Sequence, residues 1–571
     1  MAKHHIFTTA LLILLALNIA LLGCKKEESD PDTNTDPPTI SLSNIEASGL
    51  PGSNVGTTVS INASEGIKKL VIYKNGAVDS EVSYNFETTA SHDFNYTIEQ
   101  GLAAGTIVNF SFEAIDSLDK KSEQKTFSVT VEEITTHEIV QVTDDITANT
   151  TWTSDKIWEI NNIVRVPGNV TLTIEAGTVI FGDSDTKGTL LIERGGKLIA
   201  DGTFSSPIIF TSDKPVGSRN AGDWSGIVIC GKAPVNQGNL ITLEGNYGAQ
   251  YGGSDEADNS GILRHVRIEF AGRSISNNQE INSLTLAGVG NGTTIEYIQC
   301  SFGLDDSYEF FGGTVNAKYL VSYKTKDDDF DLDFGHAGNI QFALAVRGAD
   351  IADVSYSNGI EADNDGAGTI SDPFTQTVFA NVSIIGAKNQ EPGEVSPLLQ
   401  TAAHFRRNSM PTLYNSFLTG FPVGIFIDDT KPGSSQHALD NDLQIRNVIL
   451  AGVENWGNNN WGGTSGNEYG PLRQANPATG FDIDTWFGTS TFNNLIKEKW
   501  QDAGIDQSIY TSTNPKLTPN AGSILLTAGK WDNTPKATGS FFEKVAFAGA
   551  FGNEDWTSGW CNWDPQNVIY Q

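Results

Sequence analysis

Short runs of alternating apolar and polar side chains fill residues 38–134. Segments such as "TVSINAS" and "KTFSVTVEE" place an apolar residue at every second position, which is typical of a strand with one buried face. Turn residues separate these runs at intervals of about 8–12 residues, the spacing of strands in a β-sandwich. The pattern therefore predicts an N-terminal β-sandwich over residues 38–134.

A different pattern, internal repetition, begins near residue 145. "LTIEAGTVIFG" (172–182) recurs as "LLIERGGKLIADG" (190–202), in an overlay that matches Leu172 with Leu190. Repetition at a fixed short period indicates a stack of similar structural units.

A second pair of repeats has a slightly longer period. "TTIEYIQCSFGLDDSYEFFGG" (293–313) matches "VNAKYLVSYKTKDDDFDLDFG" (315–335), in an overlay that matches Tyr308 with Phe330. Periods of about 20 residues with short strands and Asn, Gly or Asp turns describe the coils of a parallel β-helix. Leucine-rich repeats share this period, but their Leu and Asn consensus is absent. We predict an all-β chain in which residues 145–450 form the β-helix.

The last segment, residues 451–571, holds eight of the eleven tryptophans of the chain. The end of a solenoid exposes unpaired strand edges, and large aromatic side chains bury such an end well. We therefore predict that this segment is a Trp-rich C-terminal cap of the β-helix. A few of the rings could instead be ligand-stacking platforms for sugars. The candidates are Trp456 and Trp461 in "ENWGNNNWGG", because the surrounding Gly and Asn indicate a loop.

Both domains resemble known architectures. Residues 38–134 resemble an immunoglobulin-like module, which on a lipoprotein is expected to act as a spacer. Residues 145–450 resemble the right-handed parallel β-helix proteins of the pectin-lyase-like superfamily. "GDWSGIVICGKAP", "YEFFGGTVN", "HFRRNSMPTLYNS" and "GAFGNEDWTSGW" are similar to segments of a family of Bacteroidota surface lipoproteins, largely of unassigned function. The resemblance implies an architecture and no particular activity, because this fold carries lyases, hydrolases and plain binders.

The N-terminal stretch "MAKHHIFTTALLILLALNIALLGC" has the pattern of a secretory signal. A short basic start precedes an apolar run, which ends at "LLGC", a sequence that resembles the bacterial lipobox. We expect removal of residues 1–23 and acylation of Cys24, followed by a flexible tether over residues 24–37. "KKEES" after the cysteine resembles the signal that exports lipoproteins of the Bacteroidota to the cell surface. The predicted location is the outer membrane, lipid-anchored, on the extracellular face.

Charge and cysteine content restrict the partners. The chain carries 36 Lys and Arg against 69 Asp and Glu, and its formal net charge of −33 repels nucleic acid and anionic lipid headgroups. Apart from Cys24, only Cys230, Cys300 and Cys561 are present, which permits one disulfide at most, and the sequence has no CxxC metal motif. We expect no nucleic acid partner, and contact with a membrane only through the lipid anchor.

The segment "KTKDDDFDLDFG" concentrates five aspartates within seven residues. The overlay of Tyr308 on Phe330 also stacks Asp305 on Asp327 and Glu309 on Asp331, and the next coil adds Glu361. Adjacent strands lie about 4.8 Å apart, and carboxylates this close cannot all ionise without a proton, a cation or a basic partner between them. The overlay therefore predicts a ladder of acidic side chains on neighbouring coils.

Three interpretations of this ladder stay open in the sequence. The acids could cap coil turns in water, since Asp is a turn former. They could bind Ca²⁺, a hard cation that selects carboxylate oxygens. They could also form a catalytic acid pair with a nearby arginine from "HFRRNS". The candidate Ca²⁺ ligands are Asp305, Asp327, Asp329, Asp331, Asp333 and Glu309. The catalytic candidates are Asp306, Asp331, Arg406 and Arg407.

Two classes of function follow. A surface lipoprotein could present the flank of its β-helix to an extracellular glycan as a non-catalytic binding or scaffold protein, accessory to a TonB-dependent transporter as lipoproteins of this phylum often are. Alternatively, the chain could be a polysaccharide lyase or glycoside hydrolase that uses the acidic ladder. The characteristic lyase motifs are absent, and "GLDDS" matches only one part of the polygalacturonase constellation. We therefore favour the binding role.

Overall fold

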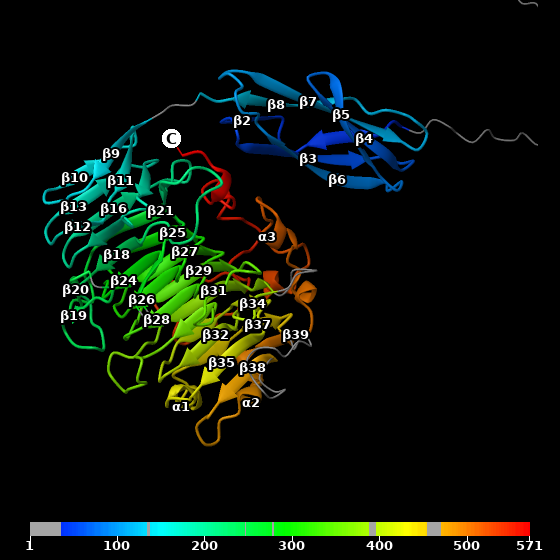
Figure 1. Ribbon diagram of the computed structural model, residues 1–571. Helices are drawn as coiled ribbons and strands as arrows, with labels where there is room; N and C mark the ends of the chain where they lie inside the picture. Colours follow the sequence, from blue (N-terminus) through cyan, green and yellow to red (C-terminus); the bar gives the residue numbers. More distant parts are fainter. Residues whose placement is uncertain are drawn as a thin grey trace, which may run out of the picture. The chain divides into compact units, whose positions relative to one another are not determined.

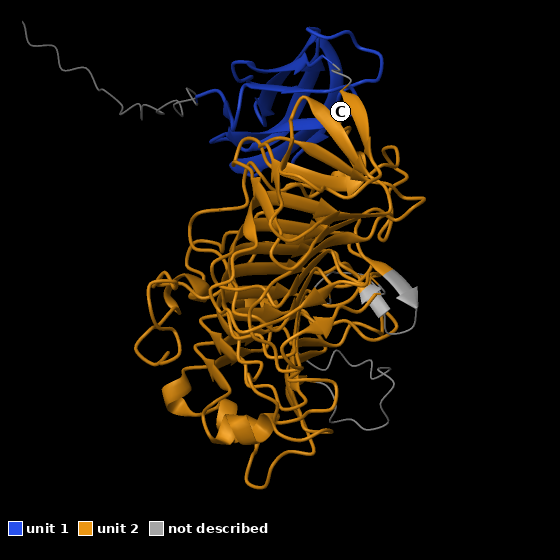
Figure 2. Cartoon of the chain, turned by 90° about the vertical axis from the view of Figure 1, so that its left-hand side faces the viewer, with its two compact units in different colours: residues 1–133 blue, residues 134–571 orange. Residues whose placement is uncertain are grey.

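The structure is a computed structural model, and it describes residues 36–133, 137–245, 247–276, 279–387, 395–453 and 470–570. The chain divides into two compact units between Glu133 and Ile134 (Figure 2). The predicted signal peptide with Cys24 lies outside the described residues, and so do Trp456 and Trp461. Within the described ranges no helix has the length and apolar composition that crossing a bilayer requires.

The first unit is a sandwich of two β-sheets, as the alternating pattern predicts (Figure 1). Its strands are β1 (Thr39–Leu42), β2 (Glu46–Gly49), β3 (Asn54–Asn62), β4 (Ile67–Lys74), β5 (Ala77–Ser83), β6 (Thr89–Thr97), β7 (Ile107–Asp116) and β8 (Lys125–Val131). One sheet has the order β1-β3-β6 and the other the order β2-β8-β7-β4-β5. Between the sheets, the ring centroid of Phe94 lies 4.7 Å from that of Phe110 and 5.2 Å from that of Phe112. The predicted sandwich is therefore confirmed.

The second unit is a right-handed parallel β-helix, which confirms the predicted all-β fold. Its strands stack in a 10-stranded and a 17-stranded sheet. The 10-stranded sheet consists of β12 (Ile163–Val166), β15 (Thr189–Ile192), β18 (Gly226–Cys230), β24 (Leu284–Ala287), β26 (Tyr308–Phe311), β28 (Phe330–Asp333), β30 (Ile360–Ala362), β32 (Thr401–Arg406), β35 (Val423–Asp428) and β38 (Gly470–Ala475).

The 17-stranded sheet starts before the predicted boundary at residue 145 and extends beyond residue 450. It consists of β9 (Glu138–Val142), β10 (Thr150–Trp152), β11 (Lys156–Ile160), β13 (Thr171–Ile174), β14 (Val179–Gly182), β16 (Lys197–Asp201), β17 (Ile208–Ser212), β21 (Gly261–Glu269), β25 (Thr294–Ser301), β27 (Asn316–Tyr323), β29 (Asn339–Val346), β31 (Val378–Ile385), β33 (Thr412–Tyr414), β34 (Phe417–Thr419), β36 (Gln444–Arg446), β37 (Ile449–Ala451) and β39 (Leu495–Lys497). Two small hairpins pair β19 (Ile241–Thr242) with β20 (Gln250–Tyr251) and β22 (Arg273–Ser276) with β23 (Gln279–Ile281).

Each coil contributes three strand segments, two of which meet at a bend in the 17-stranded sheet. In early coils these two segments are separate strands, β16 and β17, and both pair with the single long strand β21 of the next coil. The residue at the bend has a left-handed backbone, with φ of 46° for His265, 56° for Tyr297 and 59° for both Tyr319 and Phe342. Their rings stack at successive centroid distances of 4.5, 4.3 and 5.0 Å. The stack offsets the strain of the left-handed backbone and aligns neighbouring coils.

The strand register confirms one predicted repeat and corrects the other. Glu309 pairs with Asp331, as the second overlay predicts. Leu190 pairs with Val164 and not with Leu172, so the first overlay is wrong. That overlay aligned strands of two different sheets, which look alike because both carry the same alternation of inward apolar residues.

The C-terminal segment closes the last coil with its first part only. In the helix α2 (Ile483–Phe487) and the residues around it, the side chains of Phe481, Ile483, Trp486 and Phe487 join the main core of the β-helix. The short 3-10 helix η2 (Ser490–Phe492) then leads into β39. This stretch provides the predicted cap.

The rest of the segment runs back along the outside of the 17-stranded sheet (Figure 1). The amide of Gln299 donates to the carbonyl oxygen of Asn562 at 2.8 Å, and Arg219 Nη1 donates to that of Val568 at 2.9 Å. The outward face of this sheet carries Val321 and Leu344, which need an apolar cover. The covering stretch contains η3 (Trp500–Ala503), α3 (Ser508–Thr511), η4 (Ile524–Thr527) and η5 (Pro565–Asn567). The predicted location of all of residues 451–571 at the end of the solenoid is therefore corrected for this part.

Candidate functional site

The outward face of the 10-stranded sheet carries a line of polar side chains. The strand register places Glu309, Asp331, Glu361 and His404 side by side on β26, β28, β30 and β32. Residues next to them, such as Phe330, are buried in the core, since successive side chains of a strand point to opposite faces. The line therefore crosses four coils at the spacing of hydrogen-bonded strands, about 4.8 Å.

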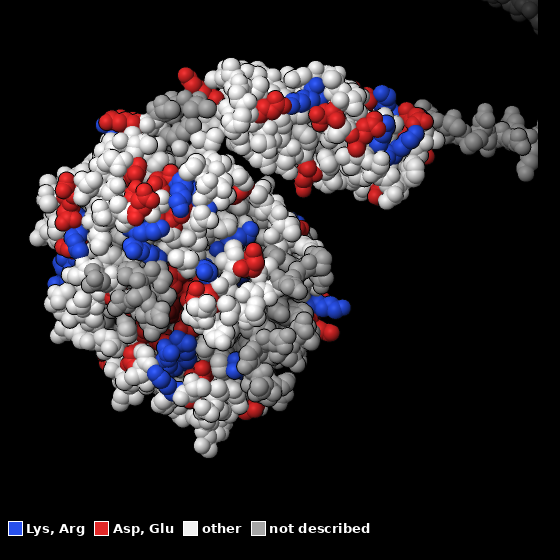
Figure 3. All heavy atoms as spheres, viewed as in Figure 1, with Lys and Arg blue, Asp and Glu red and all other residues white. Residues whose placement is uncertain are grey.

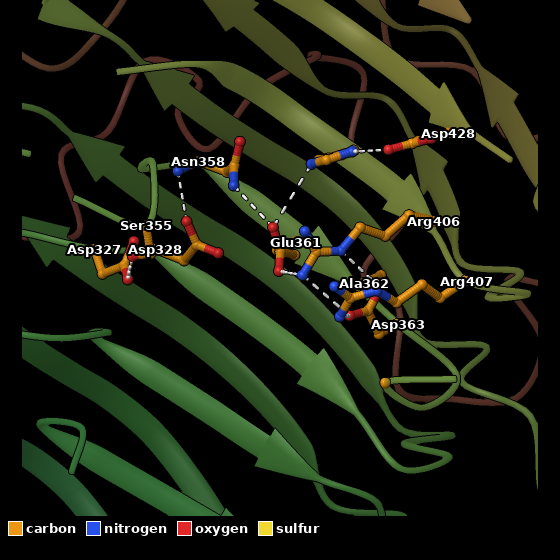
Figure 4. A network of polar contacts seen from close by, with 12 residues as sticks. Asp327, Asp328, Ser355, Asn358, Glu361, Ala362, Asp363, Arg406, Arg407 and Asp428 are labelled. Carbon is orange, nitrogen blue, oxygen red and sulfur yellow. Dashed lines mark hydrogen bonds and ion pairs between the residues drawn. The ribbon is translucent and has the colours of Figure 1, made fainter. Parts of the chain in front are cut away.

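A second line runs beside the first, two residues further along each strand. It contains Asp333, Asp363, Arg406 and Asp428, and Figure 4 shows the last three together with Glu361. In the space-filling view, acidic atoms on this side of the molecule lie recessed below the surrounding surface, with basic atoms next to them (Figure 3). We call the seven acidic residues of this face the carboxylate row. They are Asp306, Glu309, Asp328, Asp331, Asp333, Glu361 and Asp363.

The carboxylate row begins where an apolar cover ends. Val228, on β18 of an earlier coil, and Phe311, on the same strand as Glu309, are apolar outward residues, and they pack against Tyr251 in the segment between β18 and β24. Asn236 of this segment donates from its side-chain amide to the carbonyl oxygen of Asn364 at 2.7 Å. The cover therefore adjoins the row on one side.

Some of the acids hold the coils together. The turns before four successive strands carry an Asn or Asp at the same position: Asn282, Asp306, Asp328 and Asn358. The side-chain Oδ1 of each of the first three accepts a hydrogen bond from the backbone N–H of the equivalent residue in the next coil. The three donor–acceptor distances are 3.3, 2.8 and 2.5 Å. This agrees with turn capping, but the caps lie away from solvent, since Asp306 is 6% exposed and Asp328 5%. Capping of solvated corners is therefore wrong for these two residues.

Asp329, a predicted Ca²⁺ ligand, is paired inside its turn. Both Asp329 and Arg347 are fully buried, and Arg347 Nη1 donates to Asp329 Oδ1 at 3.2 Å. Ser322 Oγ donates to the same oxygen at 2.5 Å. Burial raises the pKa of Asp329 to about 6, although Arg347 and Ser322 act to lower it. Oδ1 of Asp329 is therefore occupied by structural partners, whereas its buried Oδ2 has no hydrogen-bond partner among the described residues.

Asp327 lies at the edge of the row, beside Asp305 and Asp306. Its Oδ2 accepts a hydrogen bond from Ser355 Oγ at 2.6 Å, whereas its Oδ1 is buried and has no hydrogen-bond partner among the described residues. Burial raises the pKa of Asp327 to about 7, because it outweighs the lowering effect of the Ser355 hydrogen bond. A proton or a cation would satisfy the remaining oxygen.

Five acids of the row have no basic side chain of the described residues within ion-pair distance. Burial raises the pKa of each of them well above its ordinary value, and the neighbouring carboxylates raise it further. The environment of the row therefore favours the protonated form of these carboxyl groups more than water does, and a protonated carboxyl group can donate a hydrogen bond as well as accept one. These residues are Asp306, Glu309, Asp328, Asp331 and Asp333.

In the next coil, arginine side chains form ion pairs with the acids and compensate their negative charge. Arg406 Nη2 contacts Glu361, and Arg406 Nε donates to Asp363 Oδ1 at 2.8 Å. Arg407 Nη1 donates to Asp363 Oδ2 at 2.5 Å (Figure 4). Burial raises the pKa of Glu361, but Arg406 and His404 lower it more strongly, so that the net shift is downward. Acids with raised pKa values therefore adjoin Glu361, whose pKa is lowered by its basic neighbours.

His404 lies between two carboxylates. Its Nδ1 is 3.6 Å from Glu361 Oε2 and its Nε2 is 3.3 Å from Asp428 Oδ2. The His404 ring stacks on Phe426 at a centroid distance of 4.5 Å, and the guanidinium of Arg473 lies 4.2 Å from the other ring of this pair, that of Phe426. Along the first line, successive coils therefore carry acidic side chains, then the stacked rings of His404 and Phe426, and then the basic side chain of Arg473.

Three groups of acids in or beside the row are close enough to hold a metal ion. Each group brings one oxygen from each of three residues within 4.8 Å of one another. Ca²⁺ takes 6–8 oxygen ligands, so water or a bound ligand would supply the others. The groups are Asp305, Asp306 and Asp327; Asp306, Glu309 and Asp331; and Asp328, Asp331 and Glu361. Of the predicted Ca²⁺ ligands, Asp329 and Asp333 belong to none of the groups among the described residues.

The two arginine candidates lie at the row, but their pairing opposes one of their predicted roles. Burial lowers the pKa of Arg406, yet Glu361 and Asp363 raise it more strongly, to well above the ordinary value. A guanidinium held as a cation in this way cannot readily accept a proton, as a lyase base must. Arg406 and Arg407 act here as counter-ions.

Sequence reasoning missed the contribution of His404 and Asp428. Glu361 and His404 lie far apart in the sequence although their strands are neighbours, because a long connection is inserted between β30 and β32. This insertion breaks the constant period, so the repeat cannot be recognised in the sequence at this point. The signal that remained was the alternation in "TAAHFR", which resembles "GIEAD" and "FDLDF" in placing polar residues at every second position.

The fold and this face define the second unit as a β-helix with a polar outward site. A family model described as "Pectate-lyase like beta helix domain" matches residues 144–506. The chain therefore belongs to this family of β-helix domains. No curated protein is similar enough in sequence to match it.

Several solved structures are similar at low identity. The catalytic unit of the thermostable GH87 alpha-1,3-glucanase from Streptomyces thermodiastaticus strain HF3-3 is 11% identical, over 79% of this chain and 96% of that one, with a TM-score of 0.27. Pectate lyase Pel3 from Pectobacterium carotovorum is 9% identical over 78% of this chain and 93% of that one, with a TM-score of 0.11. A fibronectin(III)-like module of CbhA from Clostridium thermocellum is 14% identical over 16% of this chain and 96% of that one, with a TM-score of 0.13. Similarity this low carries no information on activity.

Proposed function

We propose that the protein binds an extracellular glycan along the carboxylate row, as a binding or scaffold protein. The observation that supports this most is the register that aligns Glu309, Asp331, Glu361 and His404 across four coils. A straight line of hydrogen-bonding groups at strand spacing can contact hydroxyl groups on successive units of a chain molecule. Membership of a family described as pectate-lyase like also favours a glycan ligand.

The protonation pattern of the row suits hydroxyl groups. Sugar hydroxyls are both donors and acceptors, and they need partners of both kinds. The pKa of Asp331 is raised by burial, while that of Glu361 is lowered overall by Arg406 and His404. Asp331 therefore favours the protonated, donating form more than Glu361 does, and Arg406 fixes the position of the Glu361 carboxylate.

Ca²⁺ is part of this proposal. The buried and unpartnered Oδ1 of Asp327, beside Asp305 and Asp306, fits a hard cation, since carboxylate oxygens are what Ca²⁺ selects. Asp328, Asp331 and Glu361 form a second group that could hold it. In either place the ion would offset repulsion between the acids and hold them in position for the glycan.

The location of the protein is a separate part of the proposal. The lipobox-like "LLGC" supports acylation at Cys24, and "KKEES" supports export to the extracellular face of the outer membrane. In that place the protein would capture glycan beside a TonB-dependent transporter. The sandwich would then hold the β-helix away from the membrane.

A second candidate function is glycoside hydrolysis. The observation that favours it is the opposite direction of the pKa shifts of Asp331 and Glu361 on adjacent strands, since separated pKa values in a carboxyl pair are typical of an acid and its partner. Oxygens of these two residues lie within 4.8 Å of each other. This spacing is closer to the pair of a retaining enzyme, about 5–5.5 Å, than to that of an inverting one. Asp331 would be the acid and Glu361 the nucleophile.

The experiment is a binding and turnover panel on the full chain. The purified protein is titrated with soluble 1,3-glucan, xylan, polygalacturonate and chitosan oligosaccharides, with and without Ca²⁺, and reducing ends and unsaturated uronates are measured in parallel. We expect saturable binding of at least one glycan and no turnover. Asp331→Asn with Glu361→Gln should abolish binding. Glu159→Gln, in the acid group on the other sheet with Asp183 and Asp213, is the matched control and should bind normally.

Each outcome has a clear consequence. New reducing ends that disappear in Asp331→Asn would replace the binding role with the hydrolase. No binding of any glycan in the panel, or equal loss of binding in both variants, would contradict the proposed site.

A further inference from the structure

One aromatic residue of the β-helix unit has a strained backbone without the ring stacking that explains the others. Eight aromatic or histidine residues among the described residues of this unit have positive φ, and seven of them stack on another ring. The exception is Tyr356, with φ of 81° and a side chain that is 45% exposed and contacts no ring of the described residues. The seven stacked residues are His265, Phe270, Tyr297, Phe302, Tyr319, Phe334 and Phe342.

A left-handed backbone is costly for a large side chain and free for glycine. The stacked residues recover this cost through contacts between coils. Tyr356 has no such contact, so folding alone would favour glycine at this position. A strained residue that the fold does not need is a reason to look for a ligand.

The residues on both sides of Tyr356 are hydrogen-bonded to the edge of the carboxylate row. On one side of it, Ser355 Oγ donates to Asp327 Oδ2 at 2.6 Å. On the other side, Ser357 Oγ donates to the carbonyl oxygen of Lys326 at 2.7 Å. Two residues further on, Asn358 donates from its backbone N–H to Asp328 and from its side chain to Glu361, at 2.5 and 3.0 Å. The backbone that carries Tyr356 is therefore anchored at the edge of the row.

The connections on both sides of β30 carry further exposed apolar side chains. Val354, in the same connection as Tyr356, is 82% exposed, and Ile370, in the connection after β30, is also 82% exposed. Large exposed apolar side chains therefore lie in both connections that flank β30, the strand that carries Glu361. Apolar borders around a polar floor are typical of a ligand site.

We infer that Tyr356 is the stacking platform for a sugar ring of the glycan that binds the carboxylate row. The inference rests on the proposed glycan-binding function and adds a residue that sets affinity and specificity. A pyranose ring has an apolar face of C–H groups that packs on an aromatic face, while its hydroxyl edge can reach Asp327, Asp328 and Glu361. The exposed ring supplies the apolar contact and the row supplies the hydrogen bonds. Glycans whose units present a flat C–H face next to the row are preferred.

The test measures binding of the best glycan from the panel to four variants of the full chain. Tyr356→Ala should raise Kd at least 5-fold, equivalent to about 1 kcal/mol, and Tyr356→Trp should keep or improve the affinity. Tyr356→Gly should lose affinity like Tyr356→Ala while its melting temperature stays equal to or rises above that of the wild type, since glycine relieves the strain. Phe86→Ala, in the sandwich, removes another exposed aromatic side chain with positive φ and is the control. Its affinity should not change.

The results separate this inference from the function on which it rests. If the wild type binds a glycan and Tyr356→Ala binds it equally well, the stacking role is overturned and the glycan function stands. If the wild type binds no glycan in the panel, the proposed function fails and the inference falls with it. A loss of affinity in Tyr356→Ala together with a lower melting temperature and normal binding in Tyr356→Gly would assign the residue a structural role instead.

Discussion

Replacing Arg406 by alanine tests whether the row is held together by its arginine. Arg406 contacts Glu361 and Asp363, whose side chains are 11% and 5% exposed, and its own side chain is 22% exposed. Removing one partner from a buried ion pair leaves an uncompensated charge and costs about 3–5 kcal/mol. Because the guanidinium is partly exposed and Arg407 still pairs with Asp363, we expect the lower end, about 3 kcal/mol. The free energy of unfolding of the β-helix unit should fall by this amount at pH 7.

The matched control is Arg264→Ala in the same unit. Arg264 Nη1 lies 2.7 Å from Asp201 and its Nε 3.2 Å from Glu296, but these side chains are 32%, 45% and 37% exposed. Exposed pairs of this kind contribute about 0.2–1 kcal/mol. Urea unfolding followed by circular dichroism and tryptophan fluorescence compares the two variants. We expect Arg406→Ala to lower the free energy of unfolding much more than Arg264→Ala does.

Two further readouts test the electrostatic cause. Without Arg406, burial raises the pKa of Glu361, so the penalty should shrink between pH 7 and pH 5 as the acid takes up a proton. Arg406→Met combined with Glu361→Gln and Asp363→Asn should recover most of the lost stability, because no charge remains buried without a partner. If Arg406→Ala costs no more than Arg264→Ala, or if the loss does not depend on pH, the description of Arg406 as the counter-ion of the row is incorrect.

Three more predictions concern protons, cations and the anchor. In EDTA, the β-helix unit should be more stable at pH 5 than at pH 8, because folding raises the pKa values of acids such as Asp331. The stability that these acids contribute is complete below their unfolded pKa of about 4. It is lost as the pH rises through the folded pKa, which for Asp327 is about 7. Denaturant titrations at several pH values check this, and a slope of the opposite sign refutes it. At pH 8, Ca²⁺ at a hundred times its Kd should stabilise the unit by about 2.7 kcal/mol, measured by calorimetry. Asp331→Asn alters two of the acid groups and should reduce this gain. Equal melting temperatures with and without Ca²⁺ would exclude a bound cation. Cys24→Ser should release the protein from the membrane fraction and abolish acyl labelling, and continued fractionation with acyl label would rule out the anchor.

Local patterns in the sequence predict the architecture well. Alternation in "TVSINAS" and its neighbours is enough for the sandwich, and the repeat that places Glu309 on Asp331 is enough for the β-helix and its register. Both patterns reflect the same cause, since side chains that face a core must be apolar at every second position. Where connections are short, the period stays constant and the alignment of coils can be read directly.

The site could be predicted only in part, because its members come from coils with long insertions. The sequence predicts Glu361 in the coil after Asp331, and the register confirms it, but His404 lies too far along the chain for its place beside Glu361 to be recognised from a repeat. The pairing of Arg406 with Glu361 and the burial of Asp329 against Arg347 depend on this three-dimensional alignment. The return of the C-terminal segment along the 17-stranded sheet also has no local signal beyond the apolar outward residues of that sheet.

A crystal structure of the full chain with the glycan of highest affinity tests the central claim most directly. The account predicts density for sugar units on the outward face of the 10-stranded sheet, in contact with Glu309, Asp331 and Glu361, and with one ring on Tyr356. The same glycan should show no density in crystals of the Asp331→Asn, Glu361→Gln variant. Sugar bound instead on the sandwich or on the C-terminal segment, with the carboxylate row free of it, would contradict the account.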